Sequence, residues 1–301
     1  MTRATRTRMA ALCVAVALLV GVASGIGVFM RGDGSTAGAV SIRGERFEYV
    51  TTGVYEYNPE RLVAEGVGWD VFNLFVAVPA LLLSVPAVAR GSFRGRLFAS
   101  GLLAYLFYQY LMYAMAWAFG PLLPLFVLIY ATALGGAIWL ASSIGLNGLE
   151  RRFSERFPRR GMAALSSIMA LVLIGMWSQL IAVGLRGDLS GANLLGQTTL
   201  VVQALDLGLV VPAALFTAVA LWRRSPVGYL LGTVFVVKAV AMAAAICAML
   251  VSAWIVEGSP EVGGFVIFGV AALVAAWLGL RMYRSALPAS ATDLLATGAA
   301  R

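Results

Sequence analysis

The chain has 301 residues, of which 61% are hydrophobic and 12% are charged, and its formal net charge is +8. That charged fraction is about half the value of a soluble domain, and apolar runs of roughly 18 residues or more recur along the chain, so the composition excludes an ordinary soluble protein. The chain has no histidine, which removes the commonest ligand of zinc and haem and the usual general base near neutral pH.

Eight apolar runs are long enough to cross a membrane as helices. They cover residues 9–30, 70–89, 97–119, 122–143, 162–185, 199–222, 227–254 and 263–281. We therefore expect an all-α fold, a polytopic transmembrane bundle of eight helices. The first run also resembles a signal peptide, because basic residues precede an apolar core and small residues follow it. It continues to Met30, which favours a retained span.

The arginines lie in short clusters between the apolar runs, as the flanks of membrane spans do. If the N-terminus lies in the cytoplasm, sixteen arginines fall on inside segments and five on outside segments. This bias predicts that both termini are cytoplasmic. The arginine clusters at the ends of the spans also account for the positive net charge, so no nucleic-acid partner is expected. The expected partner is the lipid bilayer.

Short sequence matches recur in the same order in the two halves of the chain. MAAL stands at 9–12 and 162–165, MRGDGS at 30–35 matches LRGDLS at 185–190, and VPALLLSVPAVARGSFRG at 78–95 matches VPAALFTAVALWRRSPVG at 211–228. This order predicts a parallel 4+4 repeat, with copies at 1–160 and 161–285 and a disordered cytoplasmic tail at 286–301. Chance similarity between Leu-, Ala- and Val-rich helices is the alternative.

Two segments between the spans have patterns of their own. In the outer loop 31–69, ERFEYVTTGVYEYNP (45–59) alternates aromatic with charged or polar residues around 51–53, which predicts a small extracytoplasmic β-hairpin. On the inside, IGLNGLERRFSERFPRR (144–160) has Leu149, Phe153 and Phe157 at near-helical spacing with arginines between them. We expect this amphipathic segment to lie in the headgroup layer.

The only lysine of the chain, Lys238, stands in the middle of the seventh run. At 1.5 Å per residue it lies roughly 20 Å from the cytoplasmic edge, where a lone ammonium costs at least about 2.5–3.5 kcal/mol. Asp206 in the preceding run lies at a similar depth, and Gln203 lies one turn further out. We therefore expect an intramembrane pair of Lys238 and Asp206, with Gln203 within hydrogen-bonding reach.

The repeat adds residues from the first half to this pair. With Pro79 aligned on Pro212, Tyr105 falls on Lys238 and Asn73 falls on Asp206. Tyr105, Tyr108 and Gln109 share a helical face of the third span. The candidate site for a small molecule or a proton therefore consists of Lys238, Asp206, Gln203, Tyr105, Asn73, Tyr108 and Gln109. Asp70, at the outer edge of the second span, is interpreted only as a helix start.

Three functions remain open on these residues. A polar cluster near the midplane of a duplicated bundle is typical of secondary transporters, so binding or transport of a small molecule or ion comes first. The Lys–Asp pair is alternatively a brace between helices of a structural or accessory subunit. A membrane enzyme is the weakest alternative, because no hydrolase, metalloprotease or P-loop motif is present. We expect no catalytic residue, no metal and no cofactor, and the sequence does not indicate an oligomeric state.

Three stretches carry a resemblance to a family. They are VYEYNP, GWDVFNLFVAVPALLLS, and the pattern ALDLGLVVPAALF followed by RRSPVGYLL and VVKA. These resemble uncharacterised bacterial multi-pass inner-membrane proteins. The resemblance implies a location in the bacterial inner (plasma) membrane and implies no activity.

Overall fold

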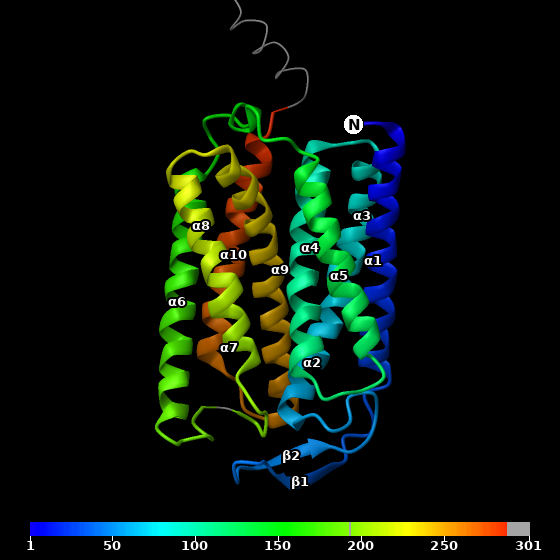
Figure 1. The fold of residues 1–301 in the computed structure, drawn as a ribbon, viewed down its shortest axis with the longest axis vertical. Coiled ribbons are helices and arrows are strands. Elements are labelled where there is room, and N and C mark those ends of the chain that lie inside the picture. Colours follow the sequence, from blue (N-terminus) through cyan, green and yellow to red (C-terminus); the bar gives the residue numbers. More distant parts are fainter. Residues whose placement is uncertain (193, 288–301) are drawn as a thin grey trace, which may run out of the picture.

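The computed structural model describes residues 1–192 and 194–287. Within these residues, eight helical segments are long and apolar enough to cross a membrane. They lie side by side along one axis, and a small two-stranded sheet covers one end of the bundle (Figure 1). The prediction of eight apolar membrane-spanning helices is confirmed. Of the predicted disordered tail, residues 288–301 lie outside the described part of the chain.

Six of the eight segments are continuous α-helices, and two are interrupted. The continuous helices are α1 (Arg3–Phe29), α4 (Phe93–Ala116), α5 (Leu123–Ser142), α6 (Arg159–Leu185), α9 (Pro226–Glu257) and α10 (Val262–Ser285). The first interrupted segment is α2 (Glu60–Phe72), η1 (Asn73–Ala77) and α3 (Val78–Ala89). The second is α7 (Val201–Leu205), η3 (Asp206–Val210) and α8 (Val211–Trp222).

The interruptions are π-helical turns, and each directly precedes a Val–Pro pair. Pro79 and Pro212 have no N–H, so neither can make the hydrogen bond to the carbonyl four residues back that would continue an α-helix. Instead, the N–H of Val78 donates to the carbonyl of Asn73, and the N–H of Val211 donates to the carbonyl of Asp206. These bonds span five residues, as in a π-bulge, which is frequent at functional sites.

The helices are grouped by sequence, with α1 to α5 on one side of the bundle and α6 to α10 on the other (Figure 1). Glycines allow a close approach between the two groups. A Cβ atom at Gly68 in α2 would collide with the backbone of Ala248 in α9, and one at Gly101 in α4 would collide with the side chain of Val237. Small residues at helix contacts let membrane helices pack backbone to backbone.

The second span begins at Glu60, ten residues before the predicted start at 70. Its first turns are polar, so hydropathy alone does not include them. Arg61 lies 3.1 Å from Glu65, 3.4 Å from Glu257 at the end of α9 and 2.5 Å from Glu261 before α10. These ion pairs hold the start of α2 against the second group of helices.

The hairpin is present, but its predicted position is wrong. Strand β1 (Thr36–Val40) pairs antiparallel with β2 (Arg46–Val50), so the turn lies at 41–45 and not at 51–53. Gly44 adopts a φ of +84° in this turn, which glycine does without strain. Gly53 has a φ of +87° and packs against the backbone of Arg31, so it closes the loop onto the end of α1.

The connection 144–160 also differs from the expected amphipathic segment. Only Leu149–Arg152 forms a short 3-10 helix. Phe153 and Phe157 are buried, and their rings lie 5.9 and 4.8 Å from the ring of Tyr229 in α9. The apolar side chains therefore pack on the protein, while Arg151 and Arg156 remain exposed.

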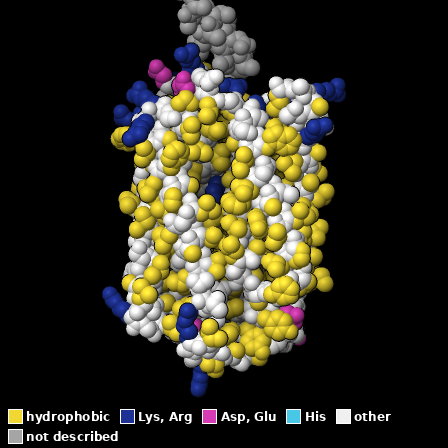
Figure 2. Space-filling view, viewed as in Figure 1, with side chains coloured by type: hydrophobic (Ala, Val, Ile, Leu, Met, Phe, Trp, Pro, Cys, Tyr) yellow, Lys and Arg dark blue, Asp and Glu magenta, His cyan; other side chains and the backbone are white. Residues whose placement is uncertain are grey.

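The two ends of the bundle differ. The arginine-rich end is the end at which α1 begins and α10 ends, and the sheet end carries β1 and β2 (Figure 1). On the face in Figure 2, Lys and Arg side chains gather at the ends and hydrophobic side chains cover the middle.

Candidate functional site

Lys238 lies in the middle of α9, roughly 18 Å along the axis from Pro226. Its Nζ atom lies 4.6 Å from the centre of the Tyr108 ring, which is the geometry of a cation–π contact. Among the residues that the structure describes, no carboxylate lies within 4.0 Å of this amine, because every ion pair found there involves Arg61. The ammonium therefore has an aromatic face beside it and no carboxylate of the described residues within 4.0 Å.

Asp206 is the first residue of η3, and its carboxylate is buried. Tyr108 donates its hydroxyl to Oδ1 of this carboxylate, and Trp177 of α6 donates its indole N–H to Oδ2 at 2.8 Å. Each oxygen therefore has a donor from an uncharged side chain. Such donors cost less desolvation free energy than a second buried charge.

Lys238 and Asp206 thus both contact Tyr108, and they form no direct ion pair with each other. The ring of Tyr108 contacts the amine, and its hydroxyl contacts the carboxylate. The sequence places both charges at the right depth, but the expected direct contact between them is replaced by a tyrosine from the other group of helices.

Lys238 and Asp206 differ in their exposure. Lys238 is only partly buried, and Figure 2 shows a narrow hollow in the apolar middle of the bundle with a basic side chain at its base. Asp206, by contrast, is buried.

The matching positions of the first group are closed and uncharged. The Tyr105 hydroxyl donates to Oδ1 of Asn73 at 2.7 Å, and both side chains are fully buried. Asn73 starts η1 just as Asp206 starts η3. Nδ2 of Asn73 has no hydrogen-bond partner within the described residues. This pair is neutral, so of these two matching pairs of positions only the one in the second group carries charges.

The two glutamines of the predicted site have different surroundings. Gln109 is fully buried in α4, one turn from Tyr105, and neither atom of its amide has a partner in the part of the chain described. Gln203 is partly buried in α7. It makes no side-chain hydrogen bond to Asp206, whose two oxygens are taken by Tyr108 and Trp177.

Sequence reasoning missed Trp177 and misread Asp70. Trp177 falls on Ser24 when the two MAAL stretches are aligned, but nothing in either span marks it as a partner of Asp206. Asp70 is not a helix start, since α2 begins at Glu60. Its carboxylate is buried and accepts a 2.5 Å hydrogen bond from the hydroxyl of Tyr55, a residue of the outer loop. A hydrogen bond between Ser24 and Tyr110 lies in the same group of helices.

The apolar middle, the basic ends and the eight spans decide the class of the protein. It is an integral membrane protein. No family model, curated protein or solved structure matches the chain.

Proposed function

We propose that the protein binds a small carboxylate-bearing molecule at Lys238 and carries it across the membrane. The observation that supports this is the surroundings of the amine. Lys238 is only partly buried, the Tyr108 ring lies beside its Nζ atom, and no carboxylate of the described residues lies within 4.0 Å of it. A lone ammonium in hydrocarbon costs at least about 2.5–3.5 kcal/mol. A carboxylate bound beside the amine neutralises this charge.

Asp206 and Tyr108 have a positioning role in this proposal. Asp206 is bound by Tyr108 and Trp177, so it does not compete with the ligand for the amine. The hydrogen bond to Asp206 fixes the Tyr108 ring, and the ring in turn supports the ammonium. The ligand thus meets a preorganised cation, which lowers the cost of ordering on binding.

We further propose that the chain contains two copies of one four-span unit. Support comes from the two π turns, each of which starts with Asn73 or Asp206 and ends before a Val–Pro pair. Transporters with parallel repeats bind their substrates between the two copies near the midplane. Lys238 and Tyr108 come from different copies in this arrangement.

We also propose that the arginine-rich end faces the cytoplasm of a bacterium and that the membrane is its plasma membrane. The support is the positive-inside bias together with the position of α1's start and α10's end on the same side of the bundle (Figure 1).

The test of binding uses the purified protein in neutral detergent and a series of carboxylates, from acetate to octanoate, each beside its amide. Carboxylates of the right size should raise the midpoint of thermal unfolding, and their amides should not. Lys238→Met should abolish the shift. Tyr105→Phe removes a hydroxyl at the matching position of the first group and should preserve it.

Transport is tested in proteoliposomes with the carboxylate that binds best. Uptake should require Lys238 and should fail in a Lys238→Met protein that is folded and monodisperse. If no carboxylate stabilises the protein more than its amide does, and native mass spectrometry finds no bound small anion, the proposal is wrong.

A structural brace is the second candidate function, and one observation favours it. Asp206 joins α4 to α6 through Tyr108 and Trp177. A pure brace predicts that Lys238 contributes to stability and not to binding. The sign of the stability change in Lys238→Met therefore separates the two functions.

A further inference from the structure

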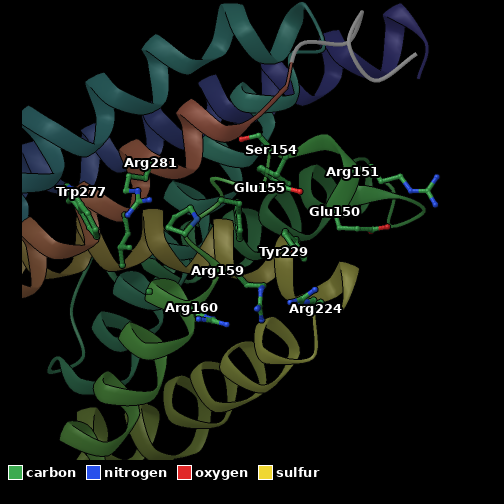
Figure 3. Close-up of a pocket in the computed structure, with 15 residues that line it drawn as sticks. Glu150, Arg151, Ser154, Glu155, Arg159, Arg160, Arg224, Tyr229, Trp277 and Arg281 are labelled. Atoms are coloured by element: carbon green, nitrogen blue, oxygen red, sulfur yellow. The ribbon is translucent and has the colours of Figure 1, made fainter. Parts of the chain in front are cut away.

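A cavity of about 740 Å³ lies at the arginine-rich end of the bundle, far from Lys238. Its walls come from the connection before α6, the turn between α8 and α9, and the last turns of α10 (Figure 3). Three segments that are distant in the sequence therefore form one concave surface, at the end where the bundle meets the headgroup layer.

The charge of this cavity is strongly positive. Five arginines line it and two glutamates oppose them: Arg151, Arg159, Arg160, Arg224 and Arg281 against Glu150 and Glu155. None of these seven residues forms an ion pair within the described part of the chain, where all such pairs involve Arg61. The excess of arginine is thus left uncompensated.

The arginines of the cavity differ in their hydrogen bonds. Nη1 of Arg159 donates to the carbonyls of Leu221 and Trp222 at 2.8 and 3.0 Å, which fixes its guanidinium at the end of α8. Figure 3 shows Arg159, Arg160 and Arg224 close together on one wall, while Arg281 lies on another. Arg160, Arg224 and Arg281 are exposed, and no side-chain hydrogen bond within the described residues occupies them.

The rest of the lining is aromatic or apolar. Tyr229 packs on Phe153 and Phe157 to form the floor. Trp277 is 54% exposed, and the guanidinium of Arg281 lies 4.9 Å from its ring. A tryptophan at this level is typical of the membrane–water interface. The cavity therefore combines an arginine rim with a surface that accepts apolar groups.

We propose that this cavity binds the phosphate group of an anionic amphiphile, with the headgroup of an anionic phospholipid as the source that the position favours. Arginine guanidinium binds phosphate oxygens through two parallel hydrogen bonds. No side chain caps α6, whose first residues line the cavity, so its N-terminal dipole adds to the attraction. Basic pockets between spans on the cytoplasmic side bind lipid headgroups. This site is independent of the proposed transport at Lys238.

The test compares lipids added to the purified full-length protein in dodecyl maltoside micelles. Phosphatidylglycerol should raise the midpoint of thermal unfolding, and phosphatidylcholine should not. Native mass spectrometry of the unaltered protein should show phosphatidylglycerol retained in preference to phosphatidylcholine. A variant with Arg160, Arg224 and Arg281 all changed to Gln should bind phosphatidylglycerol at least about tenfold more weakly, because each basic residue near an anionic surface contributes about 1 kcal/mol.

The matched control changes Arg3, Arg8 and Arg90 to Gln. These arginines are exposed at the same end of the bundle but lie outside the cavity, so this variant should retain its affinity. Equal losses in both variants, or equal retention of the two lipids by the unaltered protein, would overturn the proposal. Inorganic phosphate is the second arm: stabilisation by phosphate alone that depends on the same three arginines supports the phosphate site and assigns it a soluble ligand.

Discussion

Lys238→Met removes a charge within a membrane span that no carboxylate of the described residues approaches within 4.0 Å. A lone ammonium in the hydrocarbon costs at least about 2.5–3.5 kcal/mol. The contact with the Tyr108 ring, at 4.6 Å from its centre, returns about 0.5–2 kcal/mol. The Asp206 carboxylate, which shares Tyr108 with the amine, reduces the remaining cost further. The unliganded variant should therefore be more stable than the unaltered protein by about 1–2 kcal/mol.

The measurement is reversible unfolding in mixed micelles of neutral and denaturing detergent, followed by helical circular dichroism. Gln203→Met is the control, since Gln203 is a partly buried and uncharged residue of the neighbouring α7. It reports the general gain from an apolar replacement, which should be below about 1 kcal/mol. A Lys238→Met protein that is less stable than the unaltered one by more than about 1 kcal/mol would refute the reasoning, because the amine would then have a favourable partner.

Three further predictions use the same unfolding assay. Tyr108→Phe leaves Oδ1 of the buried Asp206 without its donor and should lower the free energy of unfolding by about 1.5–3 kcal/mol. Tyr105→Phe removes a hydrogen bond to an uncharged amide and should lower it by about 1 kcal/mol. Equal losses would contradict a charged Asp206. Gly68→Ala places a Cβ against the backbone of Ala248 and should cost about 1–3 kcal/mol, while Gly25→Ala, with nothing nearby, should not destabilise. Arg61→Gln breaks three ion pairs and should cost about 1 kcal/mol at low salt and less at high salt; a salt-independent loss would point to packing by its side chain instead.

Hydropathy was sufficient for the eight spans, because an apolar run of this length has few other stable structures. It failed where polar residues extend a helix beyond the membrane, as at Glu60 and Arg61. The hairpin was misplaced for a local reason. Both Gly44 and Gly53 have positive φ values, and only the contacts of Gly53 with Arg31 reveal that it does not form the hairpin turn.

The depth of Lys238 and Asp206 was predictable, because a helix rises by a fixed distance per residue. The tyrosine between them was not. Tyr108 was assigned to the polar face of α4, but its contact with both charges depends on how the two groups of helices meet. Trp177 in α6 was missed for the same reason. Contacts between helices that are far apart in the sequence leave no periodic signal within either helix.

The π turns impose a strict register on the polar residues that they carry. Such a turn contains one residue more than an α-turn, so it rotates the preceding helix by about 100° relative to a straight continuation. Inserting or deleting one residue between Asp206 and Pro212 would rotate the carboxylate of Asp206 by about 100° relative to α8 and away from its two donors. Changes of chain length should therefore be tolerated in the loop before Val201 but not within η3.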